Sequence, residues 1–150
     1  MFYNKTKSQL KKAKYIYGDY YGKCSKVLSE LVHFYSKEKG YKIAMWGGGL
    51  KGTVFLDLID RDREYINYVF DIDKSKFNLQ LPTGHIIVDY KSENYQDIEV
   101  VLIMNNNFET EIAGMLNEIG MKVLLVNIDS VICGNLSKEE ALDLYSRRIL

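Results

Sequence analysis

A glycine-rich hexapeptide between a predicted strand and a predicted helix carries the clearest chemistry in the sequence. Gly47, Gly49 and Gly52 give the spacing G-x-G-x-x-G, with Gly48 and Lys51 between them. In this setting the first glycine allows a tight turn, the second lets a diphosphate approach the backbone, and the third lets helix and strand pack closely. The amide N–H groups that start the helix attract an anion, and Lys51 adds a cation. The hexapeptide predicts a phosphate-binding turn, with a bare structural turn as the alternative.

Two polar residues follow later predicted strands and would share an edge with this turn. Asp71 comes roughly twenty residues after the glycines, where an acid accepts hydrogen bonds from ribose hydroxyls in dinucleotide-binding domains. The alternative is that Asp71 only caps the next segment. Asn105 could bind a base or sugar hydroxyls, while Asn107 would cap the next helix. Asp71 and Asp73 have a spacing that suits Mg²⁺, but this pattern is common after strands and we expect no metal.

His85 is the one residue that suggests catalysis. It follows the turn Pro82-Thr83-Gly84, which places it at the mouth of the third predicted strand, at an edge rather than in the core. A histidine at this place could donate to a phosphate or act as a general base, because imidazole as a group titrates near neutral pH. A turn histidine that caps the strand end is the simpler interpretation. No complete catalytic constellation accompanies it, so whether the chain is an enzyme stays open.

Hydrophobic spacing predicts the elements that position these residues. Apolar residues at helical spacing alternate with short runs that are apolar on both faces, which is typical of a parallel sheet covered by helices. We therefore expect an α/β fold: a doubly wound, mostly parallel, Rossmann-like sheet of about five strands. The connection between the second and third strands shows no clear helix. The predicted strands are 42–46, 66–70, 84–88, 98–104 and 122–126, and the predicted helices are 24–39, 50–59, 108–119 and one from Ser137 to about 148.

Composition and length restrict the class of protein. The 150 residues suit one compact unit, which we divide into an N-terminal helical extension, 1–40, and a Rossmann-like domain, 41–150. Twenty basic residues balance twenty acidic ones, so we expect no nucleic acid and no membrane as partner. Cys24 and Cys133 have no spacing for zinc or a disulfide scaffold. The first residues contain no apolar leader, and we expect a cytoplasmic protein.

The start of the chain is rich in lysine and tyrosine. We expect a short helix or an ordered arm here, with three uses open: stacking on bases, binding a partner protein, or a solvated helix packed on the sheet. The last is the most common outcome. The N-terminal helices are also a candidate homodimer seam. The lysines are Lys5, Lys7, Lys11, Lys12 and Lys14, and the tyrosines are Tyr15, Tyr17, Tyr20 and Tyr21.

Three segments together resemble the C-terminal domain of the sugar C-methyltransferases, enzymes of deoxysugar biosynthesis. They are 42–53, with the strand, the glycine turn and Lys51-Gly52; 69–88, with Val69-Phe70-Asp71 and the Pro82 turn; and 100–112, with Asn105 and Glu111-Ile112. In that family the domain is a Rossmann-like lobe that helps to enclose a nucleotide-sugar. The family's zinc-binding cysteines and its S-adenosylmethionine-binding domain are absent from this sequence.

Residues and resemblance lead to one functional hypothesis with two alternatives. We expect a nucleotide-ligand-binding domain, for a nucleotide-sugar of deoxysugar or polysaccharide biosynthesis, with binding residues Gly47, Gly48, Gly49, Lys51, Gly52, Asp71 and Asn105. One alternative is a non-catalytic interaction or regulatory module with a degenerate site. The other is a domain that binds NAD or a similar dinucleotide. The expected partners are the small nucleotide ligand and either a second copy or a separate methyltransferase subunit.

Overall fold

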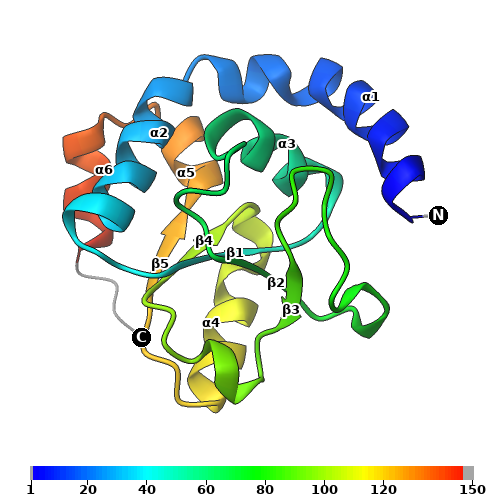
Figure 1. Cartoon of the computed structure of the whole chain (residues 1–150). Coiled ribbons are helices and arrows are strands. Elements are labelled where there is room, and N and C mark those ends of the chain that lie inside the picture. Colours follow the sequence, from blue (N-terminus) through cyan, green and yellow to red (C-terminus); the bar gives the residue numbers. More distant parts are fainter. Residues whose placement is uncertain (1, 147–150) are drawn as a thin grey trace.

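Five parallel strands form a single sheet in this computed structural model, which describes residues 2–146 (Figure 1). The strand order is β3-β2-β1-β4-β5, with β1 in the centre. Met45 of β1 pairs with Val69 on one side and Leu102 on the other. The prediction of a parallel, Rossmann-like α/β sheet is confirmed. The strands are β1 (Ile43–Trp46), β2 (Tyr68–Asp71), β3 (Ile87–Asp89), β4 (Val100–Ile103) and β5 (Leu124–Asn127).

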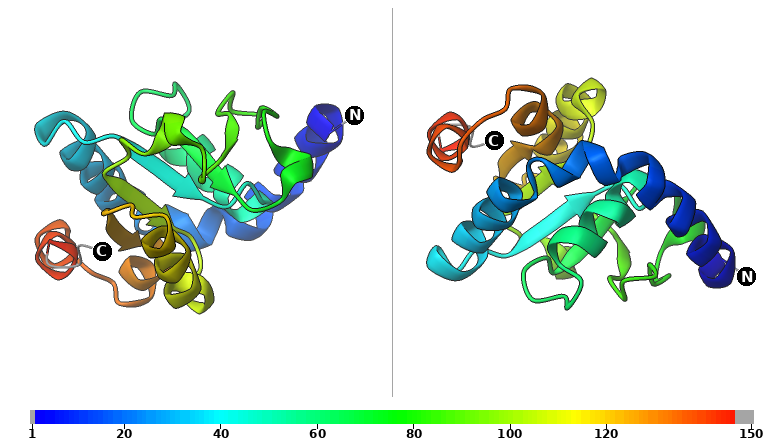
Figure 2. Two further views of the ribbon diagram at one scale, coloured as in Figure 1. Left: turned by 90° about the horizontal axis from the view of Figure 1, so that it is seen from below. Right: turned by 90° about the horizontal axis from the view of Figure 1, so that it is seen from above.

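Helices cover both faces of the sheet, as the two views of Figure 2 show. Successive residues of a strand point to opposite faces, so Ile43 and Met45 belong to one core cluster and Ala44 to another. Ile112 and Leu116 of α4 (Glu109–Glu118) pack in the cluster that contains Ala44. The other face carries the remaining helices: α1 (Phe2–Gly22), α2 (Ser25–His33), α3 (Leu50–Ile59), α5 (Ile128–Cys133) and α6 (Lys138–Tyr145).

The N-terminal helix α1 is longer than the short helix or arm expected from the sequence. It lies along α3, and its N-terminal end projects past the body of the molecule (Figures 1 and 2). Tyr21 is fully buried, and its ring meets that of Phe55 with centroids 5.8 Å apart. Lys14 forms an ion pair with Asp57 of α3. Helix α1 is therefore fastened to the body along its inner face.

Most predicted elements are present, and the differences have local causes. The predicted helix 24–39 begins at Ser25 and changes to a π-helical turn over Phe34–Glu38. Strand β3 begins three residues late, because Gln80 and Ile86 first form an antiparallel bridge. The link between β2 and β3 is irregular as expected, with a 3₁₀ turn at 74–76.

The C-terminal elements combine one confirmed boundary with one helix that was not predicted. Helix α5 follows β5 directly, and its first turn is capped by the side chain of Asn127. Ser137 caps α6 in a capping box with Glu140, as the sequence indicates. The predicted end of that helix, near 148, lies outside the described residues.

Replacing Gly52 by alanine tests the contact between α3 and β1. A Cβ at this position would lie 2.7 Å from Met45 Cε and 2.8 Å from the carbonyl oxygen of Gly47, which is backbone and cannot move aside cheaply. We expect Gly52→Ala to lower the free energy of unfolding by about 1–3 kcal/mol. Gly114→Ala, on an exposed turn of α4 where a Cβ meets nothing within 4 Å, is the matched control and should not destabilise. Equal melting temperatures for the two variants would contradict the close contact.

Candidate functional site

The glycine loop leaves β1 in a conformation that only its glycines permit without strain. Gly47 has φ +105°, in the left-handed region, and its N–H donates to the carbonyl of Phe70 at 2.8 Å. At Gly48 a Cβ would lie 2.8 Å from Ile87 Cδ1 and 3.2 Å from Asp71 Oδ2. Gly47 and Gly48 therefore allow the loop to pass close to the ends of β2 and β3.

Asp71 holds this loop in place from the end of β2. Its Oδ2 accepts a hydrogen bond from the Gly48 N–H at 2.9 Å, and its Oδ1 accepts one from the Asp73 N–H at 2.9 Å. Lys76 Nζ lies 3.9 Å from Oδ2. Asp71 is a buried residue, with 8% of its surface exposed. The structure thus gives Asp71 a positioning role towards the loop, and the residue does not line the cavity described next.

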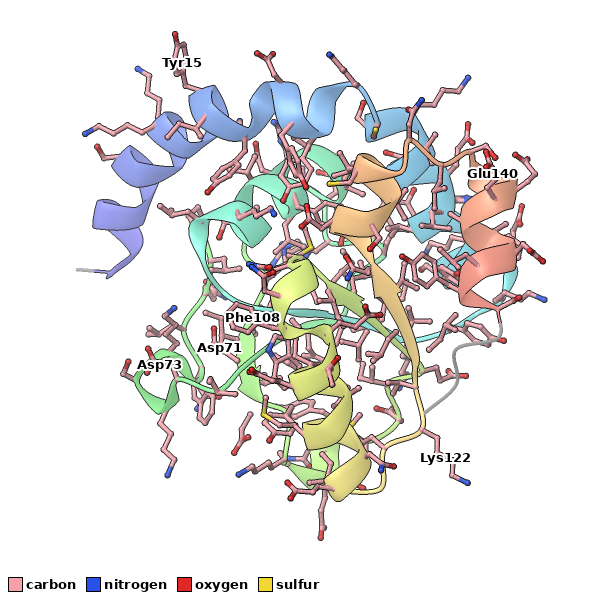
Figure 3. The ribbon with its side chains drawn as sticks, turned by 180° about the vertical axis from the view of Figure 1, so that it is seen from behind. Tyr15, Asp71, Asp73, Phe108, Lys122 and Glu140 are labelled. Atoms are coloured by element: carbon pink, nitrogen blue, oxygen red, sulfur yellow. The ribbon has the colours of Figure 1, made fainter. Side chains whose placement is uncertain are left out.

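A cavity of about 420 Å³ opens beside the glycine loop, at the carboxyl ends of β1 and β4. The chain leaves β1 for α3 on one face and leaves β4 for α4 on the other, so the cavity lies at the topological switch point of the sheet. Gly47, Gly49, Lys51 and Gly52 form one side of it. Much of the remaining wall is apolar, with Trp46, Ile72, Met104, Phe108 and Met115; Figure 3 shows Phe108 at the start of α4. Ligands of open α/β sheets bind at such a point.

The N-terminus of α3 faces this cavity without a side-chain cap. Gly49 is the N-cap residue in extended backbone, φ −80° and ψ −178°, and has no side chain to accept from the first amides. A helix leaves its first N–H groups without partners inside the helix, and they carry a partial positive charge. An ideal Cβ on Gly49 would meet nothing within 4 Å. The second glycine therefore leaves open space at the place where the motif predicts a phosphate.

Lys51 lines the cavity but is already engaged with the body of the protein. Its Nζ lies 3.4 Å from Asp129 Oδ1 and 4.9 Å from the centre of the Tyr20 ring. Its carbonyl oxygen accepts a hydrogen bond from the Tyr21 hydroxyl at 3.1 Å. Desolvation by burial lowers the pKa of Lys51 from its ordinary value. An anion in the cavity would share this ammonium group with Asp129.

Asn105 lies where the sequence places it, on the cavity wall after β4. Its Oδ1 accepts a hydrogen bond from the Asn107 N–H at 2.9 Å and so caps the short 3₁₀ turn, 106–108, that precedes α4. The expected cap by Asn107 is not the observed one, because Phe108 occupies the N-cap position of α4 and supplies no side-chain hydrogen bond. Asn105 is thus both a wall residue and a local cap.

The expected edge position of His85 is wrong. The residue is only 2% exposed and precedes β3, so it lies towards the amino end of the parallel sheet, away from the glycine loop. His85 Nε2 forms a hydrogen bond with Asp60 Oδ2 at 3.0 Å, and Nδ1 forms one with the Thr83 hydroxyl at 2.7 Å. The buried Asp60 carboxylate also accepts three backbone hydrogen bonds, from 64, 65 and 66. This network fastens two chain turns together at the amino edge.

Several cavity residues carried no functional signal in the sequence analysis. Trp46, Met104, Phe108 and Met115 are apolar or aromatic, and their types alone indicate packing. Only their positions could have indicated that they line a site, because Trp46 ends one predicted strand and Met104 ends another. The carboxyl ends of adjacent parallel strands lie at the same edge of a sheet.

Comparison with known proteins agrees with this architecture. The C-methyltransferase C-terminal domain family matches residues 3–123. The chain belongs to this family. No curated protein matches the chain. The part of this family member that the structure describes contains no helix long and apolar enough to cross a membrane.

Two solved structures are similar to this C-methyltransferase C-terminal domain at low sequence identity. One is UDP-D-quinovosamine 4-dehydrogenase from Vibrio fischeri, at 21% identity and TM-score 0.45, covering 65% of this chain and 88% of that one. The other is a Rex-family repressor, at 19% identity and TM-score 0.42, covering 74% and 68% of the two chains.

Removing the Asp71 carboxylate tests whether it positions the glycine loop. Asp71→Ala leaves the buried Gly48 N–H without its acceptor, so we expect the free energy of unfolding to fall by about 1–3 kcal/mol. Asp73→Ala is the matched control, because Asp73 is exposed and its carboxylate accepts its hydrogen bonds from the nearby Ser75. Chemical denaturation of both variants measures the difference. If Asp71→Ala destabilises the protein no more than Asp73→Ala does, the Asp71 carboxylate does not hold the glycine loop in place.

Proposed function

We propose that this domain binds a nucleotide-sugar used in deoxysugar or polysaccharide biosynthesis. The observation that carries the proposal is the uncapped N-terminus of α3, which follows a glycine turn and faces a cavity of about 420 Å³ at the switch point of the sheet. Helix N-termini at such points bind phosphate through backbone amides. The cavity volume lies within the range of small-molecule sites. Family membership supports a role beside a C-methyltransferase, and the resemblance of three segments to sugar C-methyltransferases supports a sugar substrate.

The proposed ligand would use both the polar and the apolar sides of the cavity. The diphosphate would lie against Gly47, Gly49 and Gly52, with Lys51 as the nearby cation. The apolar wall suits the flat face of a base or the carbon face of a sugar ring, because aromatic side chains pack well against such surfaces. Asn105 would supply the amide hydrogen bonds on that side. His85 has no part in this arrangement.

Asp71 favours a second candidate, a dinucleotide such as NAD. An acid at the end of β2 is the usual ribose-binding group of dinucleotide-binding domains. Each oxygen of Asp71 accepts one backbone hydrogen bond, so the carboxylate keeps capacity for ribose hydroxyls. A nucleotide-sugar and a dinucleotide share the diphosphate, and only measured binding separates them.

The domain would act beside a methyl-transfer domain, either in a longer chain or as a separate subunit. Among the described residues, the cavity holds one acid, Glu111, one cation, Lys51, and no nucleophile paired with a base. We therefore assign binding to this domain and leave the methyl transfer to the partner. A purely regulatory module that binds no nucleotide remains the competing hypothesis.

A thermal-shift panel tests the proposal directly. The probes are NAD, NADP, S-adenosylmethionine and dTDP-, UDP- and CDP-sugars, each added separately to the purified chain. A ligand at about 100 times its Kd stabilises the folded state by roughly 2.7 kcal/mol, which raises the melting temperature by several degrees. We expect this rise with one class of nucleotide-sugar. A rise with NAD alone would favour the dinucleotide, and no rise at all would contradict nucleotide binding.

Replacing Gly49 by valine then tests whether the loop is the binding site. The backbone of Gly49 suits any residue and its Cβ position is open, so the fold should be kept while the new methyl groups occupy the space of the diphosphate. We expect the affinity for the nucleotide to fall at least roughly tenfold, or 1.4 kcal/mol. Gly114→Val, at another glycine with open space, is the control and should bind normally. Unchanged affinity in Gly49→Val would place the ligand elsewhere.

A further inference from the structure

The outer face of α1 presents an exposed, ordered surface with two large apolar side chains. Tyr15 is 90% exposed and Ile16 is 67% exposed, and Figure 3 shows Tyr15 pointing away from the molecule. Lys12 and Asp19 are exposed on the same helix. The inner face of α1 is occupied by its packing on α3, through residues such as Tyr21. The outer face has no corresponding cover within the described chain.

The spacing of these four residues places them on one side of the helix. Lys12, Tyr15, Ile16 and Asp19 follow the i, i+3, i+4, i+7 pattern of a single helical face. The four positions are also symmetric along the helix, because Lys12 and Asp19 are equally far from the midpoint between Tyr15 and Ile16. In an antiparallel pair of identical helices with a two-fold axis at that midpoint, Lys12 of one copy stands level with Asp19 of the other. Tyr15 likewise stands level with Ile16.

The charges on this face make it complementary to itself. Asp19 is the only acidic residue of α1, and Lys14, on the inner side, is already paired with Asp57. In the antiparallel arrangement each Lys12 would meet the Asp19 of the other copy, giving two ion pairs in all, one on each side of the apolar centre. An isologous dimer requires this kind of self-complementary patch.

We propose that α1 is a dimerisation helix, which packs antiparallel against α1 of a second copy with the two-fold axis between Tyr15 and Ile16. An anionic membrane or nucleic acid would be repelled by Asp19 at one end of the face, whereas a second copy uses it. The inference does not depend on the proposed nucleotide site, because the outer face of α1 is separate from the cavity wall.

The size of the helix predicts a weak dimer. Its 21 residues span about 32 Å at 1.5 Å per residue. One face of a single helix buries less than the roughly 800 Å² per partner of a standard stable interface. We therefore expect a concentration-dependent equilibrium with a dissociation constant in the micromolar range.

Charge-reversal variants at the two ends of the face provide the test. Lys12→Glu sets two carboxylates level with each other, and Asp19→Lys sets two ammonium groups level, so each variant alone should dimerise at least tenfold more weakly. Mixed in equal amounts, the two variants restore both opposite-charge pairs and should form a heterodimer. Sedimentation velocity over a range of concentrations, with one variant fluorescently labelled, measures all three samples. Both positions are exposed, and circular dichroism checks that the fold is kept.

Two matched controls and one apolar variant complete the design. Lys26→Glu and Asp62→Lys make the same changes of charge at exposed positions outside the face and should dimerise like the original chain. Tyr15→Glu should abolish the dimer, because it places charge at the apolar centre. A chain that is monomeric at every concentration overturns the proposal. So does a dimer that survives both charge reversals, or a mixture of the two variants that fails to associate.

Discussion

The close approach of α3 to β1 is the constraint on which the site depends. With hydrogen as its side chain, Gly52 lets the helix lie where a Cβ would be 2.7 Å from Met45 Cε and 2.8 Å from the Gly47 carbonyl. This approach allows α3 to start directly after the glycine loop, so its first amides point to the carboxyl edge of the sheet. The outer surface of α3 in turn supports α1, because Tyr21 packs on Phe55. A bulkier residue at 52 would displace the helix, the loop and the support of α1 together.

Asp71 shows how one carboxylate can fix the glycine loop through the backbone. Its hydrogen bond to Gly48 crosses from β2 to the loop and fixes the turn before any ligand arrives. A preformed loop costs less conformational entropy on binding than one that must become ordered. The structure shows the hydrogen bond to the loop, and ribose binding by Asp71 stays a prediction. The hydrogen bond to Gly48 holds the amides of the loop in place beside the cavity.

The sequence allowed the sheet and the glycine loop to be predicted, because both depend on local patterns. A short run of β-branched and apolar residues predicts a buried strand at Val100-Val101-Leu102-Ile103, and all four residues are buried. The environment of His85 could not be predicted, because its partner Asp60 lies 25 residues away and no periodicity links the two. The late start of β3 has a similar cause: a bridge between Gln80 and Ile86 depends on a chain reversal that the turn residues suggest but do not define. For Lys51, the motif indicates a cation at the turn, while its tie to Asp129 depends on α5, which was not predicted.

Helix α1 connects the cavity with the outer surface of the molecule. The Tyr20 ring lies under the Lys51 ammonium group, and the Tyr21 hydroxyl donates to the Lys51 carbonyl, so the first turn of α3 is held from the side of α1. Tyr15 and Ile16, on the outer face of the same helix, lie about one turn before these tyrosines. An anion that draws Lys51 away from Asp129 would change the cation–π contact with Tyr20. By reciprocity of binding free energies, any coupling through this path would act equally in both directions. Lys51 of the glycine turn thus contacts the cavity on one side and the tyrosines of α1 on the other.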